Sequence, residues 1–84
     1  MTDVPVLLSS PVNFAVIQLP LRKYPGVVVQ GDTLLGIVTT LSRMQKLLTK
    51  GDLEELRVEI DSMEEEFSEV LKHYRKICAE HSIT

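Results

Sequence analysis

The second half of the chain carries apolar residues at alternating three- and four-residue steps without a break. This spacing places their side chains on one stripe of an α-helix and predicts a long amphipathic helix over residues 52–81. A stripe this regular is typical of a helix that packs along its whole length, as in coiled coils. Its residues are Leu53, Leu56, Ile60, Met63, Phe67, Val70, Tyr74 and Ile77.

A shorter helix is predicted over residues 32–50, where the same spacing recurs. Its end is marked by Gly51, which suits the left-handed backbone just past a helix, and Asp52 with Glu55 forms a capping box for the next helix. The two helices therefore form an antiparallel hairpin. The apolar stripe of the shorter helix consists of Leu34, Ile37, Leu41, Met44 and Leu48, and Leu35, Val38 and Leu47 widen it.

The first part of the chain has β character. The segments 12–19 and 26–30 are rich in β-branched and aromatic residues, and the short connection 20–25 fits the loop of an antiparallel hairpin. Residues 1–11 form either an N-terminal arm or a third, edge strand. The expected fold class is α+β, in which a short β-hairpin over residues 12–30 precedes the helical hairpin.

The two predicted helices differ in length, and this difference suggests self-association. Taken as about 17 and about 28 helical residues at 1.5 Å per residue, the first spans about 25 Å and the second about 42 Å, so the hairpin cannot cover its longer arm. The uncovered arm must lie against the strands, the N-terminal arm or another subunit, and we expect a homo-oligomer. The expected interface residues are Phe67, Val70, Leu71, Tyr74, Ile77 and Cys78.

Composition is that of one folded domain. The 84 residues are 44% hydrophobic and 25% charged, so residues 1–84 are expected to form a single domain. A single cysteine cannot form an internal disulfide, which favours a cytoplasmic protein. No apolar run reaches the length of a membrane span, so no membrane partner is expected.

Charge is distributed unevenly along the chain. Residues 1–50 carry five basic and two acidic side chains, a net charge of +3, whereas residues 51–84 carry four basic and ten acidic ones, a net charge of −6. The acidic helix would repel phosphate backbones, which argues against duplex nucleic acid as a partner. An anionic ligand would have to bind the N-terminal half.

One segment gathers the residue types of a ligand site: two cations, an aromatic ring, two glycines, a carboxylate and a helix N-terminus. A phosphate could bind the cations, a base could stack on the tyrosine, and the polar side chains could contact a ribose. The alternative interpretation is a polar hairpin loop followed by a helix cap. The candidate ligand-binding residues are Arg22, Lys23, Tyr24, Pro25, Gly26, Gln30, Gly31, Asp32 and Thr33.

Catalytic and metal-binding chemistry is not indicated. The chain shows no nucleophile–base pair, phosphate-binding loop or zinc motif, so neither an enzyme nor a cofactor is predicted. His73 follows Glu69 at helical spacing, but two ligands without a third do not predict a metal site. An acidic face formed by Glu64, Glu65, Glu66 and Glu69 is either a solvated helix side or a surface for a basic protein.

The run from Ala15 to Leu34 resembles the signature of a small uncharacterised bacterial family, a domain of unknown function whose members read approximately LPxRxxPGVVxQGDSL. This resemblance implies no function, but it makes the Arg22–Asp32 segment the characteristic part of the chain. Pro25-Gly26 and the run from Gln30 to Leu34 are also similar to HicB-type antitoxins, although no further strand or DNA-binding segment follows the helix here.

Two functions from different classes are compatible with these features. The first is a non-enzymatic homo-oligomeric protein that sequesters a small anionic, nucleotide-derived signalling ligand through residues 22–33, in the manner of phage anti-defence sponges. The second is an antitoxin or immunity protein that binds a protein partner through the acidic second helix.

Overall fold

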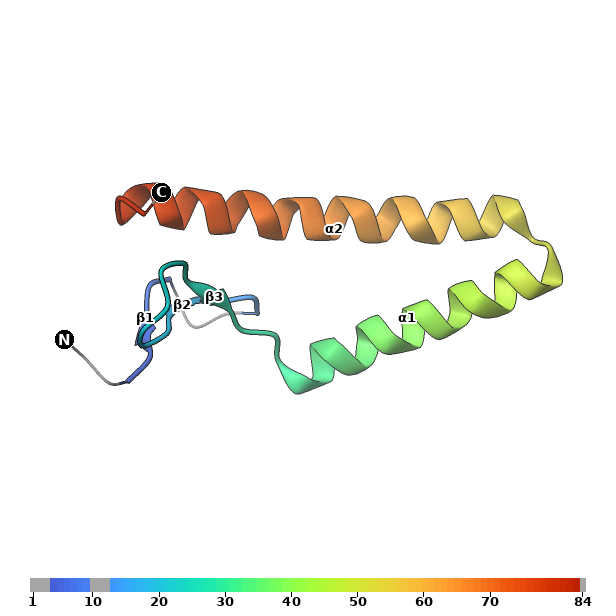
Figure 1. Ribbon diagram of the computed structural model, residues 1–84. Helices are drawn as coiled ribbons and strands as arrows, with labels where there is room; N and C mark the ends of the chain where they lie inside the picture. Colours follow the sequence, from blue (N-terminus) through green and yellow to red (C-terminus); the bar gives the residue numbers. More distant parts are fainter. Residues whose placement is uncertain (1–3, 10–12, 84) are drawn as a thin grey trace. The chain divides into compact units, whose positions relative to one another are not determined.

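The computed structural model describes residues 4–9 and 13–83, and it has an α+β fold (Figure 1). A three-stranded antiparallel sheet precedes two helices, which confirms the predicted fold class. Of the two alternatives for the N-terminal segment, the structure has the edge strand, at residues 6–7. The elements are β1 (Val6–Leu7), β2 (Val16–Gln18), β3 (Gly26–Val27), α1 (Gly31–Lys50) and α2 (Leu53–Glu80).

The chain divides into two compact units. The first, here called the strand unit, combines the strands with the C-terminal turns of α2 from Val70 onward. The second, here called the hairpin unit, is Gly31–Glu69 and contains α1 and the first part of α2.

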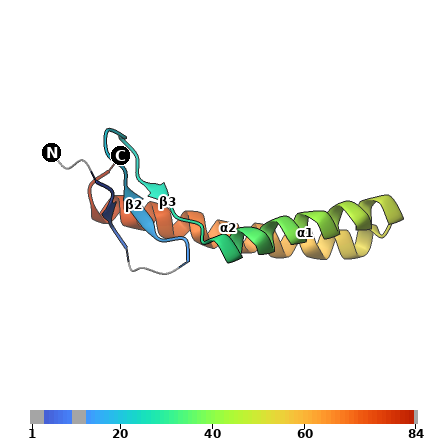
Figure 2. The same ribbon diagram turned by 90° about the horizontal axis from the view of Figure 1, so that it is seen from below.

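The sheet of the strand unit has the order β1-β2-β3, and Figure 2 shows β2 and β3 running side by side. Val6 pairs with Gln18 on one edge of β2, and Val16 pairs with Val27 on the other. The strands are shorter than predicted. Phe14 adopts a left-handed backbone with φ 62°, which interrupts the extended run before β2. Residues 1–3 and 10–12 of the predicted arm and first strand lie outside the described residues.

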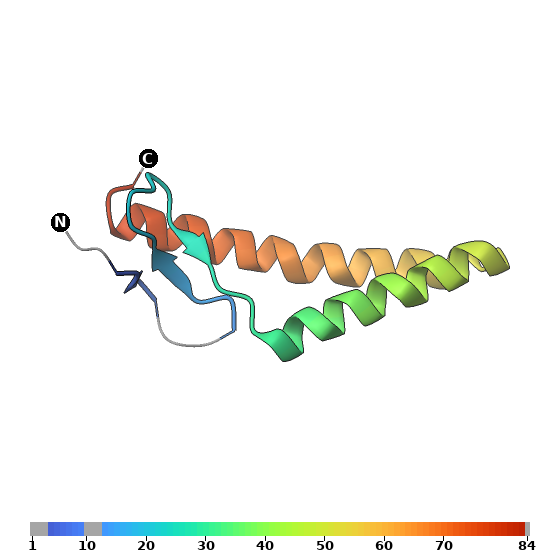
Figure 3. The same cartoon turned by 60° about the horizontal axis from the view of Figure 1, so that its bottom comes forward.

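The C-terminal turns of α2 complete the core of the strand unit by lying along the sheet (Figure 3). Val16 is fully buried, and Ala15, Ile77 and Cys78 are also buried. Ile77 and Cys78, which were predicted to form a subunit interface, are therefore buried within the strand unit of their own chain. The long arm is sheltered at these positions without a second copy.

The turn between the helices follows the sequence signals closely. Gly51 has φ +80°, its amide donates to the Leu48 carbonyl at 3.1 Å, and the Asp52 amide donates to the Leu47 carbonyl at 3.0 Å. These two bonds form a Schellman motif that closes α1. The Asp52 carboxylate accepts from the Glu55 amide at 3.2 Å, which is one half of the predicted capping box. The Asp52 amide is already bonded to Leu47, so the reciprocal half is absent.

The start of α1 differs slightly from the prediction. The helix begins at Gly31, one residue before the predicted start at residue 32. The Asp32 carboxylate accepts a hydrogen bond from the Thr33 amide at 2.9 Å, so it satisfies one of the free amides of the first turn as expected.

The packed side of α1 is rotated from the predicted stripe. Within the hairpin unit, α1 and α2 run in opposite directions from the turn that joins them (Figure 1). The α1 residues that are at least half-buried are Thr33, Ile37, Thr40, Met44 and Leu47. Leu34, Leu41 and Leu48, which the spacing placed in the packed stripe, are exposed. The predicted stripe and the packed side differ because apolar residues surround much of α1. Their spacing alone therefore does not select one side of the helix.

Candidate functional site

The loop between β2 and β3 is held in shape by hydrogen bonds from one side chain. The amide nitrogen Nε2 of Gln18 donates to the carbonyls of Leu19 at 3.2 Å and Arg22 at 2.8 Å. The Arg22 amide donates to the Leu19 carbonyl at 3.4 Å, and Leu21 takes a left-handed backbone with φ 61°. The loop is thus a tight turn with its backbone tied to the end of β2.

This loop displays two cations and an aromatic ring. Arg22 and Lys23 are exposed, and Tyr24 is 53% exposed. The Lys23 Nζ lies 5.2 Å from the centroid of the Tyr24 ring, a cation–π arrangement. Pro25 is buried and Gly26 pairs with Ile17 in the sheet, so the chain returns to rigid structure directly after the tyrosine.

Tyr74 on α2 belongs to the surroundings of this loop. A hydrogen bond with Cys78, and then burial, raise the pKa of Tyr74 above its ordinary value of 10.0, and the charge of Tyr24 adds to the effect. An electrostatic effect of Tyr24 requires it to lie near Tyr74. The sequence placed Tyr74 only in an apolar stripe and gave no sign of this proximity.

The glycines of the predicted site have different roles. A Cβ on Gly26 would lie 3.3 Å from Leu19 Cδ1, so close packing accounts for this glycine. A Cβ on Gly31 would meet nothing within 4 Å, and Gly31 does not have a positive φ. The fold itself does not require a glycine at position 31.

The structure brings only part of the predicted ligand segment together. Arg22, Lys23, Tyr24, Pro25 and Gly26 form one continuous feature of the strand unit, at and beside the loop. Gln30, the last residue of that unit's first segment, is exposed. Gly31, Asp32 and Thr33 form the first turn of α1 in the hairpin unit, and the Asp32 carboxylate is already bonded to the Thr33 amide.

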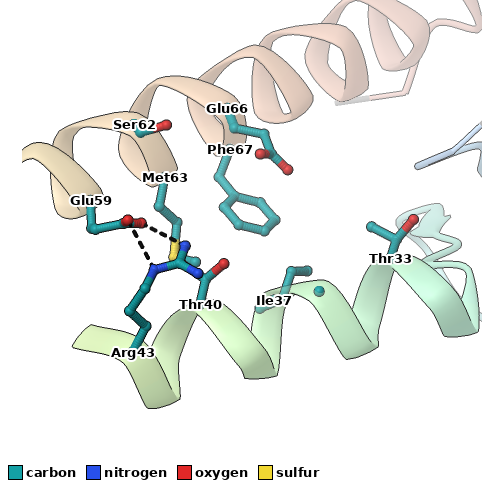
Figure 4. Close-up of a pocket in the computed structure, with 10 residues that line it drawn as sticks. Thr33, Ile37, Thr40, Arg43, Glu59, Ser62, Met63, Glu66 and Phe67 are labelled. Atoms are coloured by element: carbon teal, nitrogen blue, oxygen red, sulfur yellow. Dashed lines mark hydrogen bonds and ion pairs between the residues drawn. The ribbon is translucent and has the colours of Figure 1, made fainter. Parts of the chain in front are cut away.

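A second candidate site, which the sequence did not indicate, is a groove between the helices of the hairpin unit (Figure 4). Its volume is about 370 Å³, which is at the lower end for small-molecule sites. It is lined by Thr33, Gly36, Ile37, Thr40, Arg43, Glu59, Ser62, Met63, Glu66 and Phe67.

An ion pair closes one end of this groove. Arg43 donates from Nε and Nη2 to the two carboxylate oxygens of Glu59, each at 3.0 Å. The hydrogen bond with Glu59, and then its charge, raise the pKa of Arg43. Because the guanidinium is already engaged by a carboxylate in fork geometry, it is a poor anchor for an anionic ligand. The rest of the groove offers hydroxyl groups, apolar side chains and the carboxylate of Glu66, which also disfavours an anion.

A weak sequence signal for the groove existed. Thr33 and Thr40 occupy packed positions of α1, where a leucine would fill more space, and Gly36 lies in the middle of the helix although glycine lowers helix stability. A Cβ on Gly36 would meet nothing within 4 Å, so packing does not account for the glycine.

The acidic residues of α2 remain on the surface. Glu64, Glu65, Glu66 and Glu69 are exposed, and among the described residues none of them forms an ion pair. His73 is half-buried, and its Nε2 has no hydrogen-bond partner in the described part of the chain. Within residues 4–9 and 13–83, no group of three or more histidine, cysteine or acidic side chains could hold a metal ion.

These features define a class of protein: a small α+β protein with a cationic, aromatic loop and a grooved helical hairpin. The chain belongs to the Family of unknown function (DUF6959), whose model matches residues 1–84. Searches of curated proteins and of solved structures found no match. No helix in the described ranges has the combined length and apolar character that crossing a membrane requires.

Proposed function

We propose that this protein is a non-enzymatic, homo-oligomeric binding protein that holds a small anionic, nucleotide-derived ligand at the β2–β3 loop. The observation that carries the proposal is the position of the Lys23 Nζ, 5.2 Å over the ring of a half-exposed Tyr24. This arrangement presents a positive charge beside an aromatic face, and both remain accessible to solvent.

Electrostatics support an anion at this position. Arg22 and Lys23 are exposed, and no ion pair engages either of them within the described residues. This contrasts with Arg43, whose guanidinium is neutralised by Glu59. A phosphate would gain charge-assisted hydrogen bonds from Arg22 and Lys23 without displacing an existing partner.

Stacking supports a nucleobase rather than phosphate alone. The cation covers one face of Tyr24, and the exposure of the ring leaves surface for a base or another planar group. Base–aromatic stacking is worth about 1–3 kcal/mol and does not require a particular base. The Gln18 hydrogen bonds hold the loop backbone in place, which lowers the entropy lost on binding.

A thermal-shift titration with a panel of mononucleotides, dinucleotides and cyclic nucleotides tests the proposal. A ligand at about 100 times its Kd should stabilise the protein by about 2.7 kcal/mol, which corresponds to about 10 °C or more for a domain of this size. The double variant R22A/Y24A should retain the unliganded Tm and lose the shift. Arg57→Ala, which removes an exposed cation on α2, should keep it. No shift with any nucleotide, or an unchanged shift in the double variant, would refute the proposal.

A second candidate function follows from the exposed acidic residues of α2. Four glutamates without ion pairs within the described residues could meet a basic protein surface, as in an antitoxin or immunity protein. This function predicts that a stoichiometric partner co-purifies at low salt from the native host. Reversal of Glu64, Glu65, Glu66 and Glu69 to lysine should release that partner, and retention would argue against the acidic surface.

A further inference from the structure

The hairpin unit has two different sides. Arg43 and Glu59 meet on one side of the contact between the helices, and Figure 4 shows them joined there beside the polar groove. At about 100° per residue, Leu41 is roughly 160° from Arg43 around α1, and Ile60 is roughly 100° from Glu59 around α2. In each helix, the residues that contact the other helix lie between these two positions. Leu41 and Ile60 therefore lie on the side of the hairpin opposite the ion pair.

This opposite side is an apolar face that the hairpin unit leaves exposed. It includes large aliphatic side chains from both helices, with exposures between 48% for Leu41 and 64% for Leu53. None of these aliphatic residues is charged, Gln45 is the polar residue among those of α1, and Arg57 borders Leu53 and Ile60 on α2. The apolar face consists of Leu34, Val38, Leu41, Leu48, Leu53 and Ile60.

We propose that a second copy of this chain covers the apolar face, so that two helical hairpins form a four-helix bundle. Two packed helices bury only one side of each, and a further layer is the usual way in which such hairpins complete a core. A second copy of this chain is present wherever the chain is made.

Charge favours an identical partner on this face. A symmetric dimer places the same patch on both sides of the interface, so a face with charges of one sign would repel itself, whereas an uncharged face does not. The three basic residues of α1, Arg43, Lys46 and Lys50, lie on the ion-pair side of the helix, away from the apolar face. The α1 part of the face therefore brings no cation into a symmetric contact.

The exposed area is also what a dimer requires. The chain exposes 6475 Å², whereas monomeric proteins of its mass expose about 5000 Å². The whole chain therefore exposes about 1400 Å² more than such a monomer, and a standard interface buries roughly 800 Å² of each partner. This interface differs from the arm predicted from the sequence, and it does not depend on ligand binding by the β2–β3 loop.

Sedimentation velocity on the full chain, with a matched pair of charge substitutions, tests the proposal. Leu41→Glu places a carboxylate in the apolar face and should convert a dimer into a monomer. Val58→Glu makes a similar change at an exposed valine on the opposite side of α2 and should leave the dimer intact. A wild-type protein that stays monomeric at a protein concentration about 100 times a micromolar Kd would overturn the proposal. So would a Leu41→Glu variant that stays dimeric, or a Val58→Glu variant that dissociates.

A second substitution covers the case in which Leu41→Glu does not fold. Gln45 becomes buried in the proposed interface, so Gln45→Leu should lower the dimer Kd about tenfold, because an amide no longer has to be desolvated. Lys46→Leu adds the same side chain at the next residue of α1, about 100° further around the helix and outside the apolar face. This variant should leave the Kd unchanged. Equal Kd values for wild type and Gln45→Leu, or an equal decrease in both variants, would overturn the proposal.

Discussion

Tyr74 links the candidate loop to the core of the strand unit. Its hydrogen bond with Cys78, followed by burial and the charge of Tyr24, raises its pKa above 10.0. A raised pKa means that the folded protein holds the phenolic proton more tightly than the unfolded chain does. The resulting stabilisation is fully present below about pH 10 and is lost as the pH rises through the raised pKa.

We therefore expect the free energy of unfolding to fall as the pH rises above about 10, and to fall less steeply in Tyr74→Phe. Urea unfolding of both proteins across this range measures the two slopes. Every other side chain is the same in both proteins, so the difference between the slopes isolates Tyr74. Identical slopes would show that the Tyr74 proton is not held by the folded state.

At the scale of single residues, the sequence identified those whose chemistry is local. Gly51 and Asp52 were predicted because a helix end needs only neighbouring residues. Arg22, Lys23 and Tyr24 were predicted because they are consecutive in the chain. Tyr74 could not be linked to the loop, since its contacts with Cys78 and Tyr24 depend on how the end of α2 lies on the sheet.

At the scale of elements, both helices end in the same motif with different residues. Gly51 has φ +80° after α1, and Ser82 has φ 56° after α2, where the Ile83 amide donates to the Cys78 carbonyl at 2.8 Å. A left-handed backbone costs a residue with a Cβ about 1–2 kcal/mol and costs glycine little. The two helix ends therefore differ in strain although their hydrogen bonds correspond.

This difference predicts opposite effects of two substitutions. Ser82→Gly should raise the free energy of unfolding by about 1 kcal/mol, and Gly51→Ala should lower it by about the same amount. A Cβ on Gly51 would meet nothing within 4 Å, so the cost is confined to the backbone. Chemical denaturation gives both values, and changes of the same sign would contradict the assignment of strain.

The sequence predicted the helices better than it predicted their packed sides. The regular spacing in α2 identified a long helix, and the β-rich segments identified β2 and β3 as an antiparallel pair. The rotation of α1 could not be predicted, because leucines and valines occupy most of its circumference. The groove was missed for a related reason: Arg43 and Glu59 are 16 residues apart, and only the hairpin brings them together.

At the scale of the whole molecule, two surfaces have separate proposed roles. The β2–β3 loop presents a tyrosine and two cations that form no ion pair with the residues the structure describes. The apolar face of the hairpin unit presents leucines, a valine and an isoleucine. A dimer formed through the apolar face would carry two such loops, so one assembled protein could hold two anionic ligands. The stability of this assembly would depend on protein concentration.

The measurement that tests this account most directly is native mass spectrometry of the freshly purified protein. The central claim is that the folded protein is an assembly of identical copies held by the apolar face of its helices. The account predicts ions with twice the 9.5 kDa mass of the chain, and any retained small anion would appear as an added mass on those ions. A spectrum that contains only single chains, from a sample that is helical by circular dichroism, would contradict it.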